Sequence, residues 1–212
     1  MKYISINSVF KRDTSLKRKP FINEYATPTL EMLANAKWYA TEKVDGTNIR
    51  IYPDGTVKGR TDDAQLHVGL LTTLQEIANG YAQLVEEGCL APNILFGEGY
   101  GQKVQGNLYN LRSHLFVLFD VYNEEQGIWY NRGAVNSVAD TLGLAHVPTL
   151  ATNITLPEAV EMIKTKEFKD SRLHNGAPNE GCVLRPMLEL KTNNGSRVIT
   201  KLKFRDTLPE GI

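Results

Sequence analysis

Cysteine is scarce in this chain of 212 residues, which contains only Cys89 and Cys182. The two lie far apart, and neither belongs to a group of cysteines or histidines with the spacing of a metal site. This argues against a zinc-stabilised fold, and two lone thiols are typical of a protein in a reducing compartment. Both cysteines stand among apolar residues, so we expect each to be a small buried side chain.

Long apolar runs are also absent. No segment approaches the roughly 20 apolar residues of a membrane helix, and the first residues, MKYISINSVFKRD, contain no apolar core of signal-peptide length. The sequence therefore predicts a soluble protein of the cytoplasm.

Charge of one sign is not in excess, because 24 lysines and arginines balance 24 aspartates and glutamates. Overall basicity thus gives no indication of a nucleic-acid partner, although a neutral total can hide a local basic patch. One run of cations stands out, formed by Lys11, Arg12, Lys17, Arg18 and Lys19. We interpret it as a solvated loop in preference to a phosphate-binding arm.

The chain has no internal repeat, no low-complexity tract and no Pro/Gly-rich linker, so we expect a single domain over residues 1–212. Apolar residues at helical spacing predict helices within 64–88, 135–143 and 155–163, the last with a Thr155/Glu158 capping box. Strands are expected at residues 48–52, 57–61, 93–101, 115–122, 180–186 and 196–204. The helices are interspersed among the strands without strict alternation, which indicates an α+β fold of largely antiparallel sheets with flanking helices.

The segment TEKVDGTNIR places Lys43 at the end of an expected strand, beside Glu42 and before a turn. The pattern K-x-x-G carries little information by itself, because a chain of this length contains about one such match by chance. A second match, Lys103-Val-Gln-Gly106, has no comparable context. Lys43 is therefore the candidate for a primary amine that acts as a nucleophile.

K-V-D-G-T-N resembles motif I of the covalent nucleotidyltransferases, the superfamily of ATP-dependent ligases and mRNA capping enzymes. Five further segments resemble the later motifs in the same order: GRTD with Arg60, LFGEGYG with Glu98, FVLFDVY with Phe119, EGCVLR with Glu180 and Arg185, and TKLKF with Lys201 and Lys203. Each motif is short, but six in order over residues 42–203 form a specific signal. The resemblance implies the nucleotidyltransferase fold, an ATP-grasp-like ligase adenylation domain.

Two details favour one branch of this superfamily. DNA ligases usually carry an arginine two residues after the motif I glycine, whereas Asn48 stands there in this chain, as in RNA ligases. Only nine residues follow Lys203, so we expect neither an OB-fold domain nor another appended C-terminal domain. The chain is most similar to the catalytic domain of the RNA ligase 2-like enzymes typified by phage proteins, which implies the host cytoplasm if a phage encodes it. A protein partner could supply RNA contacts that an appended domain would provide.

The resemblance implies an ATP-dependent RNA ligase that seals 5′-phosphate and 3′-hydroxyl ends, of a nicked duplex or of free strands. A lysine attacks the α-phosphate of ATP, the AMP passes to the 5′-phosphate, and the 3′-hydroxyl then displaces it. Lys43 is the implied nucleophile, and Lys201 and Lys203 are the implied catalytic contacts to the α-phosphate. Residues two apart share one face of a strand, as joint contact requires. Neighbouring cations and burial help a lysine lose its proton and stabilise charge on phosphate oxygens.

The remaining roles are also implied by the resemblance. Glu180 is the expected catalytic ligand of Mg²⁺ or Mn²⁺, since hard cations take oxygen ligands. ATP is expected to contact Glu98 through its ribose, Arg60 through its sugar or phosphates, Phe119 by stacking of adenine, and Glu42 at the adenine edge. Asn48 and Arg185 are the expected contacts to the nucleic-acid substrate.

Ordinary structural explanations compete with these roles. Phe119 could be a core residue, Glu98 and Glu180 could be rim carboxylates, and alternate lysines on a half-exposed strand are normally solvated. Three functions therefore remain open: the RNA ligase, which the motifs favour, a small DNA ligase or capping-type guanylyltransferase, and a degenerate nucleotide- or RNA-binding module.

Overall fold

The computed structural model describes residues 2–15, 17 and 20–206, and the chain divides into two compact units. Unit 1 comprises residues 1–4 and 44–147, and unit 2 comprises residues 5–43 and 148–212. One boundary falls directly after Lys43, the predicted nucleophile. That both units act together as one nucleotidyltransferase domain remains a prediction.

Unit 2 is built on a five-stranded sheet. Its strand order is β1 (Asn7–Ser8), β13 (Thr200–Lys203), β12 (Gly181–Pro186), β4 (Trp38–Glu42) and β11 (Thr149–Ile154). Neighbouring strands are antiparallel except β1 and β13, which are parallel. The unit also contains a hairpin of β2 (Phe10–Arg12) and β3 (Phe21–Tyr25), and the helices α1 (Pro28–Met32) and α4 (Leu156–Lys164).

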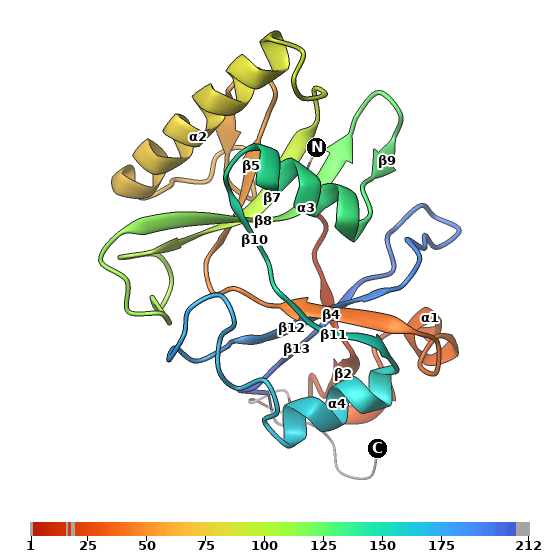
Figure 1. Ribbon diagram of the computed structural model, residues 1–212. Helices are drawn as coiled ribbons and strands as arrows, with labels where there is room; N and C mark the ends of the chain where they lie inside the picture. The colour runs from red at the N-terminus through yellow and green to blue at the C-terminus, as the bar shows by residue number, and fades with distance from the viewer. Residues whose placement is uncertain (1, 16, 18–19, 207–212) are drawn as a thin grey trace. The chain divides into compact units, whose positions relative to one another are not determined.

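One apolar core holds the sheet of unit 2 against α4. Most residues of the central strands β4 and β12 are buried, and Trp38 of β4 and Leu184 of β12 have no exposed surface. They pack with Leu156 and Val160 of α4 in a single cluster. Figure 1 shows α4 along one face of this sheet. The predicted capping box at Thr155 starts the helix, so this element is confirmed.

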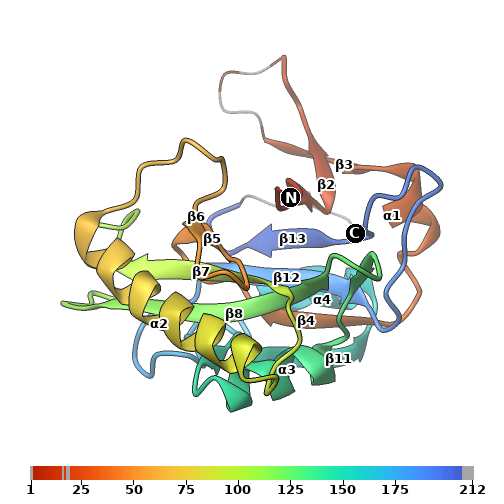
Figure 2. The ribbon, with the colours of Figure 1, turned by 90° about the horizontal axis from the view of Figure 1, so that it is seen from above.

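Unit 1 contains a six-stranded sheet. Its order is β10 (Ala145–His146), β8 (His114–Asn123), β7 (Ile94–Gly101), β5 (Thr47–Ile51) and β6 (Val57–Lys58), and β9 (Ile128–Trp129) also pairs with β8. The pairs are antiparallel except for β10 with β8. The helices α2 (Val68–Glu86) and α3 (Arg132–Thr141) cover one face of this sheet, as Figures 1 and 2 show.

The α+β fold of largely antiparallel sheets is confirmed, and each predicted helix is present with shifted ends. The long helix begins at Val68, later than residue 64, because His67 is its N-cap and accepts a hydrogen bond from Gly69 N. Cys182 is buried as predicted, but Cys89 is exposed, because it lies in the turn that follows α2. Among the described residues, no helix is long and apolar enough to span a membrane.

Candidate active site

Lys43 is positioned by the strand that precedes it. β4 ends at Glu42, and the backbone N–H of Lys43 donates to the carbonyl of Gly181 at 2.9 Å, which continues the ladder between β4 and β12 by one residue. The backbone of Lys43 is thereby fixed, while 20% of its side chain remains exposed. The predicted position at the end of an apolar strand is confirmed.

Glu180 directly precedes β12, and hydrogen bonds hold the backbone at Glu180 and at Gly181. Its carbonyl accepts a hydrogen bond from Phe204 N at 3.1 Å, just beyond the end of β13. The side chain of Asn179 accepts from Gly181 N at 2.9 Å and donates to the carbonyl of Phe168 at 2.9 Å. Asn179 is a residue that the motif comparison missed, since no motif included it.

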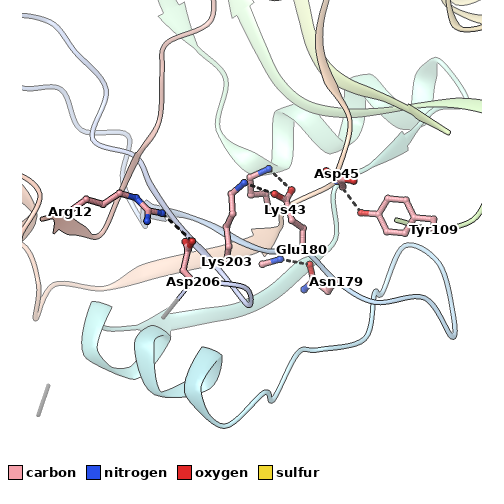
Figure 3. Close-up of polar contacts among 9 residues, drawn as sticks. Arg12, Lys43, Asp45, Tyr109, Asn179, Glu180, Lys203 and Asp206 are labelled. Atoms are coloured by element: carbon pink, nitrogen blue, oxygen red, sulfur yellow. Dashed lines mark hydrogen bonds and ion pairs between the residues drawn. The ribbon is translucent and has the colours of Figure 1, made fainter. Parts of the chain in front are cut away.

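The carboxylate of Glu180 binds two lysines. Lys43 Nζ lies 2.5 Å from Glu180 Oε2, and Lys203 Nζ lies 2.5 Å from Glu180 Oε1 (Figure 3). Only 9% of the Glu180 side chain and 15% of the Lys203 side chain are exposed. Residues from the motifs at positions 43, 180 and 203 therefore form one cluster within unit 2.

The two lysines decide the charge state of Glu180. Burial by itself would raise the pKa of this carboxyl group, but the charges and hydrogen bonds of Lys43 and Lys203 outweigh burial and lower the pKa below its usual value of 4.5. Glu180 is therefore ionised at neutral pH. One carboxylate between two ammonium groups leaves a net positive cluster, which suits the binding of a polyphosphate.

Gly181 allows the close approach of β12 to β13. Its φ is +153°, and a Cβ atom at this position would lie 2.1 Å from the carbonyl oxygen of Leu202. Only glycine fits this space, so the E-G sequence of motif IV has a steric cause. Gly181 also lies directly opposite Lys203 in the sheet, and this register brings Lys203 beside Glu180.

Glu42 is buried, with 1% of its surface exposed. One carboxylate oxygen accepts from Ser171 Oγ at 2.5 Å, and the other accepts from the backbone N–H groups of Arg172 at 2.8 Å and Leu173 at 3.2 Å. Glu42 thus fixes the loop that follows residue 170 to the end of β4. Its contact with an adenine edge remains a prediction, and nothing in the sequence indicated Ser171 as its partner.

Lys201 and Arg185 lie in the same sheet of unit 2. Lys201 and Lys203 are both partly exposed and alternate with buried Thr200 and Leu202, so the predicted shared face of the two lysines is confirmed. Arg185 is 3% exposed and lies opposite Tyr39 of β4. The contacts of Lys201 with phosphate and of Arg185 with nucleic acid remain predictions.

Unit 1 places Asn48 and Glu98 directly opposite each other on β5 and β7. Both side chains are partly buried. The Oδ1 atom of Asn48 is enclosed and makes no hydrogen bond to any described residue. A buried acceptor without a donor is unfavourable, so this atom is available to a ligand group.

Phe119 is the extra residue of a β-bulge. Phe96 pairs with Asp120 and Gly97 pairs with Leu118, so Phe119 has no partner on β7. A bulge changes the direction of the side chain that it carries. Phe119 is partly exposed, and its ring makes an edge contact with Tyr3 at a centroid distance of 5.1 Å.

Arg60 is exposed, and a neighbouring arginine holds its loop. Arg50 is 1% exposed and donates two hydrogen bonds to the carbonyl of Gly59, at 2.9 and 2.8 Å, and one to Asp62 Oδ1 at 2.9 Å. Gly59 and Asp62 lie on either side of Arg60 in the chain, so these hydrogen bonds fix the backbone at Arg60. Sequence comparison missed Arg50, although a charged residue in an apolar strand is a signal that could have found it.

The basic run near the N-terminus is partly neutralised within unit 2. Lys11 pairs with Glu24 at 2.7 Å, and Arg12 pairs with Asp206 at 3.1 Å and lies over the ring of Phe21 (Figure 3 shows the pair with Asp206). Lys17 is exposed. Arg18 and Lys19 lie outside the described residues.

The side chains available to a metal ion are few. The described residues contain no group of three or more histidine, cysteine, aspartate or glutamate side chains that could hold one. Glu180 offers carboxylate oxygens, which suit Mg²⁺ or Mn²⁺, and magnesium commonly binds through one or two carboxylates together with water and substrate phosphates. The donor set thus fits a metal bound jointly with a nucleotide.

The sequence model of the RNA ligase family matches residues 36–203. Comparison with curated proteins gives no match. Among solved structures, an apo mutant of Naegleria gruberi RNA ligase is 22% identical, with a TM-score of 0.62 over 83% of this chain and 52% of that chain. A second mutant of this ligase, with ATP and Mn, is 20% identical, with a TM-score of 0.63 over 96% and 59% of the two chains.

The Naegleria gruberi RNA ligase with PPi is also similar, at 21% identity and a TM-score of 0.62 over 94% of this chain and 59% of that chain. This chain therefore spans little more than half the length of these solved proteins, and at such identity the likeness shows the fold. The family model matches well over half of this chain, from before β4 to the end of β13. The chain belongs to the RNA ligase family.

Proposed function

We propose that this protein is an ATP-dependent RNA ligase that joins 5′-phosphate and 3′-hydroxyl ends through a lysyl-AMP intermediate on Lys43. One observation carries the proposal: the ammonium groups of Lys43 and Lys203 share the carboxylate of Glu180 at 2.5 Å each. One carboxylate cannot neutralise two ammonium groups, so the second lysine leaves a positive charge that favours a negatively charged ligand.

In the first step the Nζ atom of Lys43 attacks the α-phosphorus of ATP. The N–P bond forms, the bond from phosphorus to the bridging oxygen breaks, and pyrophosphate leaves, while the amine gives up its proton. Lys203 and Lys201, on the same face of β13, stabilise the charge on the phosphate oxygens. Glu180 orients both Lys43 and Lys203.

Glu180 would also hold the metal ion, with its carboxylate oxygens as ligands. A bound Mg²⁺ or Mn²⁺ supplies positive charge to the phosphate oxygens during transfer. Mutants of Naegleria gruberi RNA ligase have been solved with ATP and Mn, and another with AMP and Mn. These relatives support ATP as the AMP donor and a divalent metal as its companion.

The predicted adenosine and RNA contacts complete the proposal. Glu98 binds the ribose, Phe119 stacks on adenine, and Arg60 binds sugar or phosphate. The unpartnered Oδ1 of Asn48 accepts a hydrogen bond from the RNA substrate. Arg185 assists at the nucleic acid, and Glu42 lies at the adenine edge.

Intact-mass measurement after incubation with ATP and Mg²⁺ tests the first step. The wild type should gain the mass of one AMP, Lys43→Ala should gain none, and Lys58→Ala, a control lysine on β6, should behave as the wild type does. Protein already carrying AMP is first discharged with pyrophosphate. Absence of an adduct with both ATP and GTP would leave a nucleotide- or RNA-binding module instead of a ligase.

Two further comparisons determine the acceptor. An adduct with GTP in preference to ATP would indicate a capping-type guanylyltransferase. If ATP gives the adduct, nicked duplexes and single strands with RNA or DNA at the 3′-hydroxyl side distinguish an RNA ligase from a small DNA ligase. We expect joining of RNA 3′-ends, and joining of DNA ends alone would contradict the proposal.

A further inference from the structure

The loop between β7 and β8, residues 102–113, has a composition unlike the rest of the chain. No aspartate or glutamate occurs between Glu98 and Asp120, although the whole chain has as many acidic as basic residues. Within this interval the loop contributes Lys103 and Arg112. The neutral total therefore conceals one locally cationic segment.

The loop is ordered by its own contacts. Val104 is 6% exposed and belongs to the core of unit 1, and Tyr109 is 7% exposed and packs edge-on against Tyr100 at 5.5 Å. The side chain of Asn107 spans the loop, because its Nδ2 donates to the carbonyl of Leu111 and its Oδ1 accepts from Leu111 N, both at 3.0 Å. The loop is thus a folded platform anchored at two apolar side chains.

Polar side chains project from this platform. Five of the exposed residues are amides and cations, namely Gln102, Lys103, Gln105, Asn110 and Arg112, and the other two are Gly106 and Ser113. Amides and cations are the side chains that commonly contact phosphate and sugar oxygens in nucleic acids. One carboxylate approaches the loop: Asp45 Oδ2 is 3.7 Å from the position that a Cβ on Gly106 would take.

The backbone of the loop is held in an unfavourable conformation. Four residues other than glycine have left-handed φ values of 46° to 59°: Lys103, Gln105, Asn107 and Asn110. Asparagine adopts this region readily, but lysine and glutamine do not, and such residues persist where the surrounding structure enforces them, commonly at functional sites. A simple connection between β7 and β8 would not need them, because hairpin strands can be joined by two residues.

The loop is also attached to motif I. The hydroxyl of Tyr109 accepts a hydrogen bond from the backbone N–H of Asp45 at 3.2 Å (Figure 3). Asp45 follows Lys43 by two positions in the chain. The hydrogen bond between Tyr109 and Asp45 therefore links the loop to the turn that follows Lys43 in the chain.

We propose that the β7–β8 loop binds the phosphate backbone of the RNA substrate, with Lys103 and Arg112 as its ionic contacts and Gln102, Gln105 and Asn110 as hydrogen-bonding contacts. The inference rests on the proposed function and specifies where the substrate is held. A preformed loop binds with little loss of conformational freedom, which suits a surface that must engage any sequence.

The salt dependence of RNA binding tests this inference. The double variant Lys103→Gln/Arg112→Gln is compared with Lys164→Gln/Lys169→Gln, which removes two exposed cations of unit 2 and changes the net charge equally. Affinity is measured by fluorescence anisotropy over about 50 to 200 mM salt, with a labelled single-stranded RNA and a nicked RNA duplex. Loss of two phosphate contacts lowers the slope of log Kd against log salt by about 1.4 on the single strand, taking about 0.7 for each contact.

For the loop variant, the slope of log Kd against log salt should be lower than for the wild type on at least one of the two RNAs. For the control variant, the slope should equal that of the wild type on both. Both variants should still form the AMP adduct at the wild-type rate, because neither change involves a residue of the Glu180 cluster. An unchanged slope on both RNAs, or an equal loss in the control, would overturn the inference. Failure of the wild type to form the adduct would instead refute the proposed function, since RNA binding is measured without ATP.

Discussion

Replacement of Glu180 by glutamine tests the electrostatics of the cluster without changing its size. Glu180 accepts one charge-assisted hydrogen bond from each of Lys43 and Lys203, at 2.5 Å. Such a bond contributes about 1.5–3 kcal/mol. The glutamine carbonyl can still accept from one lysine, so Glu180→Gln should lower the free energy of unfolding by about 2 kcal/mol at pH 7.

The loss should depend on pH in a direction that the pKa shift determines. The pKa of Glu180 is lower in the folded protein than its usual 4.5, because the two lysines stabilise the carboxylate more than burial destabilises it. The folded state then binds the proton less readily than the unfolded chain does. The stabilisation is therefore fully present above pH 4.5 and disappears as the pH falls through the lower folded pKa. Glutamine does not titrate, so the difference between wild type and variant should narrow below pH 4.5.

Urea unfolding between about pH 7 and pH 3.5 measures this difference. Trp38 lies in β4 with no exposed surface, so its fluorescence reports unit 2 once Trp129 is replaced by phenylalanine in every protein compared. Glu167→Gln, at an exposed site of the same unit, is the control and should change stability little at any pH. A Glu180→Gln loss below about 0.5 kcal/mol at pH 7, or one that stays constant down to about pH 3.5, would refute this account of the cluster.

Three other substitutions have defined outcomes. Gly181→Ala should destabilise unit 2 by about 2 kcal/mol or more, since the new Cβ would overlap a carbonyl of β13, and a melting temperature equal to that of wild type would contradict this steric argument. Arg50→Met should lower the free energy of unfolding by about 2–3 kcal/mol, because its hydrogen bonds to Gly59 are lost. It should also raise the KM for ATP in adduct formation. Asp62→Asn should leave the free energy of unfolding and the KM nearly unchanged. Thr155→Ala removes the N-cap of α4 and should lower the free energy of unfolding in urea by about 1 kcal/mol. Thr155→Ser keeps a capping hydroxyl and should retain most of this stability.

Patterns that act within one segment predicted much of this structure. Apolar spacing located α2, α3 and α4, and alternation placed Lys201 and Lys203 on one face of β13. The order of the short motifs also selected Lys43, Glu180 and Lys203, which the fold brings together. The sequence could identify these residues as a group because each motif retains its own local pattern.

Features that depend on two segments were not predictable. The bulge at Phe119 arises from the register between β7 and β8, which no local pattern specifies. The buried contacts of Glu42 depend on Ser171, which is 129 residues away in the chain. Asn179 likewise acts through the backbone groups of Phe168 and Gly181, and residue types do not indicate which backbone groups will meet.

The sheet of unit 2 has a consequence for the synthesis of the protein. β4 is bordered by β12 and β11, which are both made more than a hundred residues later. Lys203 follows Lys43 by 160 residues. At about 5–20 residues per second a ribosome needs roughly 10–30 s to cover this interval. Until β11 is made, both edges of β4, with Trp38 on it, are without their final neighbours, and the edge that β12 covers stays unpaired longer. Unpaired edges favour aggregation. The nascent chain should therefore be most dependent on chaperones before β12 emerges, and the lysine–glutamate cluster should be the last part of unit 2 to form.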